Sequence, residues 1–96
     1  MAKKMVRGEF QQYKIDAALT AITNKIKYRL DKKGRGEYIG PHETYGIIAE
    51  EFNYELLLAL HANDSVQFYK ELLDIAVACV LGMASELPDD TSAAAE

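Results

Sequence analysis

The sequence predicts an all-α protein, a small antiparallel bundle of three main helices. Apolar residues recur every three or four positions in three separate stretches, as one face of a helix requires. Strand signals are weak, and no internal repeat is evident. With 96 residues, 49% of them hydrophobic, the chain can form one domain. So short a chain buries more apolar surface by pairing with a copy of itself, which favours completion of the bundle by oligomerisation.

The first helix is expected over about residues 9–32. Its apolar positions share one helix face: Ile15, Leu19, Ile22, Ile26 and Leu30. Gly34 is suited to end the helix, and Lys32 and Lys33 would lie at the negative end of the helix dipole. Residues 31–41 then form a glycine-rich connector, which we expect to be flexible.

The second helix is expected over roughly residues 42–61, with Pro41 in its first turn. At about 100° per residue, Glu51 and Glu55 lie roughly 40° apart. Both fall between two apolar strips of the helix surface instead of on its polar back. A short turn follows at residues 62–65, where Asn63, Asp64 and Ser65 are credible caps.

The third helix is expected over about residues 66–86. Its middle, IAVACVLGMA, carries no charge, which is typical of a helix at the centre of a bundle or in a subunit interface. Glu71 and Asp74 share one face with small residues that would let another helix approach closely. Leu87 and Pro88 end the helix. The domain therefore covers residues 1–88, and residues 89–96 are expected to be a disordered tail.

Composition excludes several classes of function. The net charge is −4 and no extended basic face is visible, so a nucleic-acid binder is disfavoured. Cys79 is the only cysteine and is expected to be a small core residue. The N-terminus lacks the apolar stretch of a signal peptide, and the longest apolar run, residues 75–83, is too short to cross a bilayer. We therefore expect a cytoplasmic protein with no membrane partner.

Four acidic residues within apolar helical stretches are the candidate functional site. Glu51 and Glu55 are spaced i,i+4, while Glu71 and Asp74 are spaced i,i+3, so each pair points one way. Folding back about the turn near residue 63 sets the two pairs opposite each other. Buried unpaired carboxylates are costly. An all-oxygen cluster therefore predicts a hard cation, Mg²⁺ by default with Mn²⁺ as a substitute.

Both the acidic residues and the basic residues before them have a second interpretation that stays open. The carboxylates could instead pair with lysine or arginine across a subunit contact. Lys32, Lys33 and Arg35 precede the acidic helix and could contact phosphates, although such a run is more often a solvated loop. No Cys or His spacing suits zinc, and no P-loop or nucleophile motif is present.

These motifs resemble those of the MazG-like all-α nucleoside triphosphate pyrophosphohydrolases, in particular a short, phage-type branch. The similar stretch, PHETYGIIAEEF…ND…ELLDIAVACV, extends from about Pro41 to Gly82. The resemblance implies a helical bundle that forms a homodimer or homotetramer. It also implies Mg²⁺-dependent hydrolysis of a nucleoside triphosphate to the monophosphate and pyrophosphate. Glu50 and Glu51 match the double Glu of the first family motif, and Glu71 and Asp74 match the second motif.

One position departs from the family pattern. The pattern requires an acid three residues after the second Glu, and that position is Tyr54 here, with Glu55 one place further on. Either Glu51 and Glu55 serve as the ligand pair, or the site has lost a ligand. A lost ligand would leave a nucleotide-binding protein or a non-catalytic helical assembly.

The predicted roles follow from the first of these options. The metal ligands are Glu51, Glu55, Glu71 and Asp74. Glu50 is an extra ligand or a base that orients the attacking water, and Lys33 and Arg35 are the predicted substrate contacts.

Overall fold

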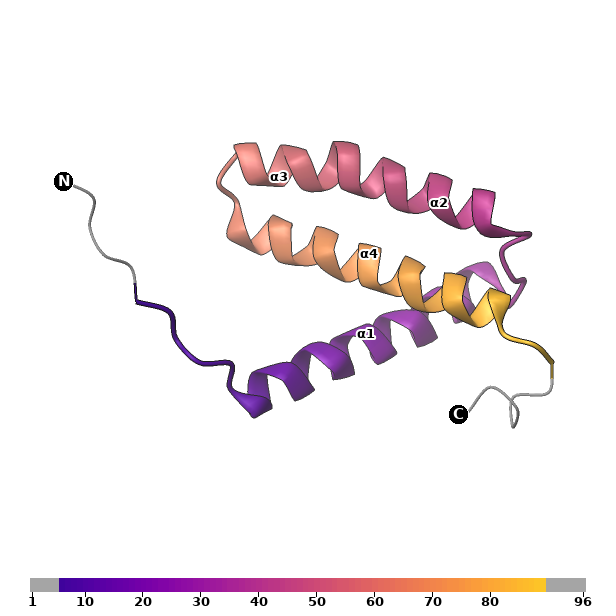
Figure 1. The fold of residues 1–96 in the computed structure, drawn as a ribbon, viewed down its shortest axis with the longest axis horizontal. Helices are drawn as coiled ribbons and strands as arrows, with labels where there is room; N and C mark the ends of the chain where they lie inside the picture. The colour runs from indigo at the N-terminus through magenta and orange to yellow at the C-terminus, as the bar shows by residue number, and fades with distance from the viewer. Residues whose placement is uncertain (1–5, 90–96) are drawn as a thin grey trace.

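A computed structural model of the protein describes residues 6–89, which fold into three helices and contain no strand (Figure 1). The first helix is α1, Gln12–Lys33. The second consists of α2, Pro41–Glu50, a π-helical segment η1, Glu51–Leu56, and α3, Leu57–His61. The third is α4, Ser65–Glu86. The all-helical class is therefore confirmed. From residue 90 on, the predicted tail falls outside the described residues.

The first helix contacts the rest of the molecule through its C-terminal half. Ile26 and Leu30 line a cavity together with Val80 and Leu81 of α4. The N-terminal half diverges from α4 (Figure 1), and no residue of α1 is buried. The helix ends as predicted at Gly34, which has a φ of 85° and donates its N–H to the Leu30 carbonyl.

The connector between α1 and α2 is held by three contacts, although its glycines predict flexibility. The backbone N–H of Tyr38 donates to Ser85 Oγ of α4 over 3.0 Å. The N–H of Ile39 donates to the carboxylate of Glu43 in the first turn of α2. Arg29 of α1 lies over the Tyr38 ring, 5.6 Å from its centroid. Three contacts, to α1, α2 and α4, therefore hold the connector next to the C-terminal end of α4.

The second helix is continuous, but it is not a regular α-helix as the sequence predicts. Backbone dihedrals remain helical on both sides of η1, at Glu50 and at Leu57. Between them, hydrogen bonds run from residue i to i+5, which makes the turn wider than in an α-helix. Short π segments of this kind are rare and often occur at functional sites. Here the π segment begins at Glu51 and includes Glu55, so it contains half of the predicted ligand set.

The last helix begins next to Asp64, one of the three candidate caps, and lies along the second helix. The Asp64 carboxylate accepts the N–H of Gln67 over 3.0 Å, and Asn63 adopts a left-handed φ of 55° in the preceding turn. α4 packs against α2, η1 and α3 in turn. The buried apolar residues come from both helices: Leu56, Ala59, Val77 and Ala78.

At Gly82 the backbone of α4 lies close to a side chain of α2. A Cβ added there would overlap the γ-methyl group of Thr44 and lie 3.2 Å from its Oγ1. This part of the small-residue face of α4 is therefore occupied by the second helix of the same chain.

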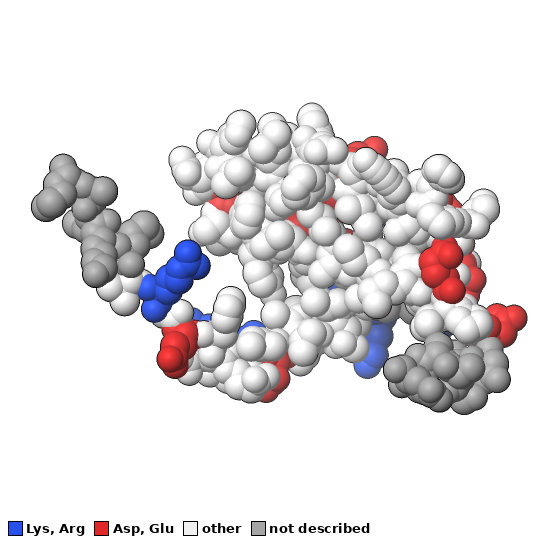
Figure 2. All heavy atoms as spheres, viewed as in Figure 1, with Lys and Arg blue, Asp and Glu red and all other residues white. Residues whose placement is uncertain are grey.

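Much apolar surface remains open to solvent. Cys79, expected in the core, is exposed. It lines a groove of about 730 Å³ with Tyr45, Ile48 and Met83, between α2 and α4. Uncharged side chains cover most of the α2–α4 face seen in Figure 2. Within the part of the chain that the structure describes, no helix has both the length and the apolar character of a membrane span.

Candidate metal centre

Three of the predicted ligands meet between the second helix and α4. Glu51, Glu55 and Glu71 each contribute a carboxylate oxygen, and these three oxygens lie within 4.8 Å of one another. Two ligands on opposite sides of one divalent ion are separated by roughly 4–5 Å, since each bond is about 2.0–2.6 Å long. The spacing of the three oxygens therefore fits a single Mg²⁺ or Mn²⁺ ion.

The π segment explains why Glu55, and not Tyr54, joins this cluster. In an α-helix the third residue after Glu51 would lie about 60° short of a full turn, and the fourth about 40° beyond it. A π turn holds roughly 4.4 residues, so the fourth residue falls about 30° short of a full turn. Glu55 thus lies on the side where an α-helix places its third residue. Tyr54 is rotated away and its side chain is 64% exposed.

Two carboxylate oxygens in the cluster lack the partners that buried polar atoms normally have. Glu71 is only 7% exposed. Its Oε2 accepts a hydrogen bond from Gln67 Nε2, but its Oε1 is buried without a partner. Oε2 of Glu51 is likewise buried and unpartnered. An unsatisfied buried oxygen costs about 1–3 kcal/mol, and more when it is charged. A cation shared by the two oxygens would offset this cost.

Glu51 has a raised pKa because it is partly buried and lies among other acids. Its pKa rises from 4.5 to about 7: burial makes the largest contribution, and the neighbouring charges of Asp74, Glu55, Glu71 and Glu50 supply the rest, in that order. A bound divalent cation would lower this pKa, because it favours the ionised carboxylates. The donor set, all carboxylate oxygen and short of positive charge, therefore fits a hard divalent metal.

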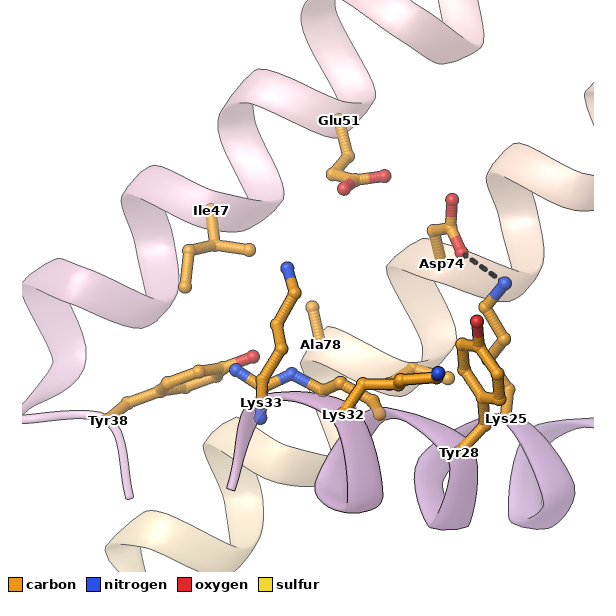
Figure 3. A pocket seen from close by; sticks show the side chains of 11 residues that line it. Lys25, Tyr28, Lys32, Lys33, Tyr38, Ile47, Glu51, Asp74 and Ala78 are labelled. Carbon is orange, nitrogen blue, oxygen red and sulfur yellow. Dashed lines mark ion pairs between the residues drawn. The ribbon is translucent and has the colours of Figure 1, made fainter. Parts of the chain in front are cut away.

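Asp74 lies beside this cluster but not within it. Its Oδ1 is 3.7 Å from the ammonium group of Lys25 on α1. Both side chains are partly exposed, so this ion pair contributes at most about 1 kcal/mol. This ion pair is formed within one chain, so it does not bear on the alternative in which the carboxylates pair with lysine or arginine across a subunit contact. Figure 3 shows Asp74 and Glu51 facing the same cavity, with Lys25 next to Asp74.

The remaining predicted site residues fall in different places. Lys33 lines a cavity of about 410 Å³ that Glu51 and Asp74 also line, and its ammonium group points toward Glu51 (Figure 3). Arg35 does not line this cavity and instead lines the cavity that Ile26 and Val80 border between α1 and α4. Glu50 is exposed at the end of α2, outside the cluster of three carboxylates.

Four residues near the centre were missed by sequence reasoning. Gln67 has a usable signal, since it precedes Glu71 by one helical turn. Lys25, Arg29 and Tyr28 lie on α1, whose position against α4 has no local signature. No family model matches this chain, and no curated protein or solved structure is significantly similar to it.

Proposed function

We propose that the protein is a Mg²⁺-dependent nucleoside triphosphate pyrophosphohydrolase of the MazG-like kind. It would convert an NTP or dNTP to the monophosphate and pyrophosphate. The observation that carries the proposal is the cluster of Glu51, Glu55 and Glu71, with two buried carboxylate oxygens that have no partner. The i,i+3 spacing of Glu71 and Asp74, and the double Glu at residues 50–51, supply the family resemblance.

Each acidic residue has a defined part in this proposal. Glu51, Glu55 and Glu71 hold the metal, and Asp74 becomes a fourth ligand when it releases Lys25. Bound Mg²⁺ would supply Lewis-acid stabilisation of the charge on the phosphate oxygens and would make a water molecule more acidic. Gln67 fixes the orientation of the Glu71 carboxylate through its hydrogen bond. Because Glu50 is exposed and outside the cluster, we assign it no metal contact.

Product analysis tests the reaction directly. Purified protein is incubated with each NTP and dNTP in the presence of Mg²⁺, and the products are separated by ion-exchange chromatography. Monophosphate together with pyrophosphate is the expected result, whereas diphosphate together with orthophosphate would contradict the proposal. Glu71→Gln should abolish turnover. Glu86→Gln, which removes one exposed acid from the same helix, is the matched control and should retain it.

The alternative function is a nucleotide-binding protein that does not cleave its ligand. The ion pair between Lys25 and Asp74 favours this alternative, because it leaves three free carboxylates where the family pattern has four. Calorimetry with Mg²⁺ and a nucleotide separates the two functions. Binding without any product after prolonged incubation would establish the alternative.

We further propose that the chain completes an antiparallel bundle by forming a homodimer or homotetramer. Support comes from α1, which buries no residue, and from the open groove that contains Tyr45, Ile48 and Met83. Met83 is 70% exposed and Tyr45 63% exposed, which is unusual for large apolar side chains that share one groove. Light scattering coupled to size-exclusion chromatography measures the mass. A monomer of 10.7 kDa at micromolar concentration would refute this proposal.

A further inference from the structure

The cavity on the Asp74 side of the cluster has walls of opposite charge (Figure 3). Glu51 and Asp74 form one side of this space of about 410 Å³. Lys25, Arg29, Lys32 and Lys33 of α1 form the opposite side. A volume of this size is typical of small-molecule sites. A ligand that suits this space would therefore carry negative charge toward α1, and a cation would be needed between that charge and the acids.

This gathering of basic residues stands out from the rest of the chain. The chain as a whole is acidic, with a net charge of −4. After Arg35 it has only one more basic residue, Lys70, which does not line the cavity. Four of the 11 basic residues nevertheless line this one space. At about 100° per residue, their spacings of four, three and one positions place them within an arc of roughly 100° around α1. Their charges therefore converge on the cavity instead of being dispersed over the surface.

Two tyrosines hold two of these cations in place. The ammonium group of Lys32 lies 5.6 Å from the centre of the Tyr28 ring, and the guanidinium group of Arg29 lies at the same distance from the Tyr38 ring. Cation–π contacts of this kind favour a defined position for the charged group. Both rings line the cavity, so the cations are oriented before any ligand arrives.

We propose that this cavity binds the triphosphate chain of the nucleotide, and that α1 supplies the charges that neutralise it. Lys32 and Lys33 contact the phosphates directly, Arg29 contacts them from its position on Tyr38, and Lys25 turns to them when Asp74 takes the metal. The proposal rests on the proposed function only in naming the anion as part of a nucleoside triphosphate. It assigns substrate recognition to the first helix, the region where the resemblance to the family is weakest.

Inorganic tripolyphosphate in the presence of Mg²⁺ is the probe, and titration calorimetry is the measurement. The test variant is Lys32→Gln/Lys33→Gln. The matched control is Lys14→Gln/Lys27→Gln, which removes the same charge from the same helix at positions outside the cavity. A charge-assisted hydrogen bond contributes about tenfold to affinity, so the test variant should bind roughly 100-fold more weakly than the wild type. The control should change by less than about threefold. Lys32→Arg/Lys33→Arg should restore binding.

Three outcomes would overturn the assignment: no binding of tripolyphosphate to the wild type, an equal loss in both double variants, or a KM for nucleotide that the test variant leaves unchanged. Failure of the proposed function gives a different pattern. In that case no nucleotide is hydrolysed, yet tripolyphosphate still binds and depends on Lys32 and Lys33. That result would support the anion-binding site and refute the enzymatic activity.

Discussion

The stability of the metal-free protein should fall as the pH rises, because Glu51 binds its proton more tightly in the folded state. Its pKa is about 7 in the fold against 4.5 as the ordinary value. Between these two pH values the folded state holds more protons than the unfolded state, so each step up in pH favours unfolding. The full difference corresponds to at most about 3 kcal/mol. Because Glu51 keeps part of its solvent contact, we expect about 1–2 kcal/mol.

The assay is urea unfolding followed by far-UV circular dichroism, since the chain has no tryptophan for fluorescence. Measurements on wild type and Glu51→Gln in the presence of a chelator, from about pH 4.5 to above pH 7, isolate the contribution of this one group. The wild type should lose stability relative to the variant over that interval and reach a constant difference above it. Parallel curves for the two proteins would refute the electrostatic reasoning. Saturating Mg²⁺ should remove the wild-type loss, because the metal binds the ionised carboxylates.

Three further predictions concern packing, ligand identity and the role of α1. Gly82→Ala should lower the free energy of unfolding in urea by about 1–3 kcal/mol, because the new methyl group overlaps Thr44. Adding Thr44→Ala to that variant should recover most of this free energy. Additive effects of the two substitutions would disprove the contact. In calorimetry, Glu55→Gln should bind Mn²⁺ at least roughly tenfold more weakly than the wild type, and Tyr54→Phe should change the affinity by less than about twofold. The reverse order would show that the residue at position 54, as in the family pattern, contributes to the metal site. Lys25→Gln should strengthen the binding of Mg²⁺ alone by about twofold to fivefold, because it frees Asp74, and it should weaken the binding of tripolyphosphate. A shift of both affinities in one direction would argue against a Lys25 that pairs with Asp74 and also contacts phosphate.

The helices were predictable from sequence because apolar spacing reports the face that each helix buries. Asp64 as a cap and Gly34 as a stop also follow from local chemistry, and the structure bears both out. The facing of Glu55 and Glu71 was predictable for a similar reason, since a short turn fixes the register of two neighbouring helices.

Other features depend on tertiary contacts that leave no periodic trace. The π segment was missed because its apolar residues are equally compatible with an α-helix. The ion pair between Lys25 and Asp74 requires knowledge of how α1 crosses α4. Cys79 was wrongly placed in the core, because an uncharged stretch of helix does not reveal which of its flanks lacks a neighbour.

The π segment has a consequence for how acidic motifs are compared between helical proteins. One added residue in an unbroken α-helix would swing everything after it by about 100°, and the apolar faces before and after could not both pack on α4. The wide turn at Glu51–Leu56 absorbs that rotation. A chain one residue shorter, with an ordinary turn there, could therefore present the same carboxylates to the same ion. Distance along the chain is then a poor guide to equivalence, and acids should be matched by the direction in which they project.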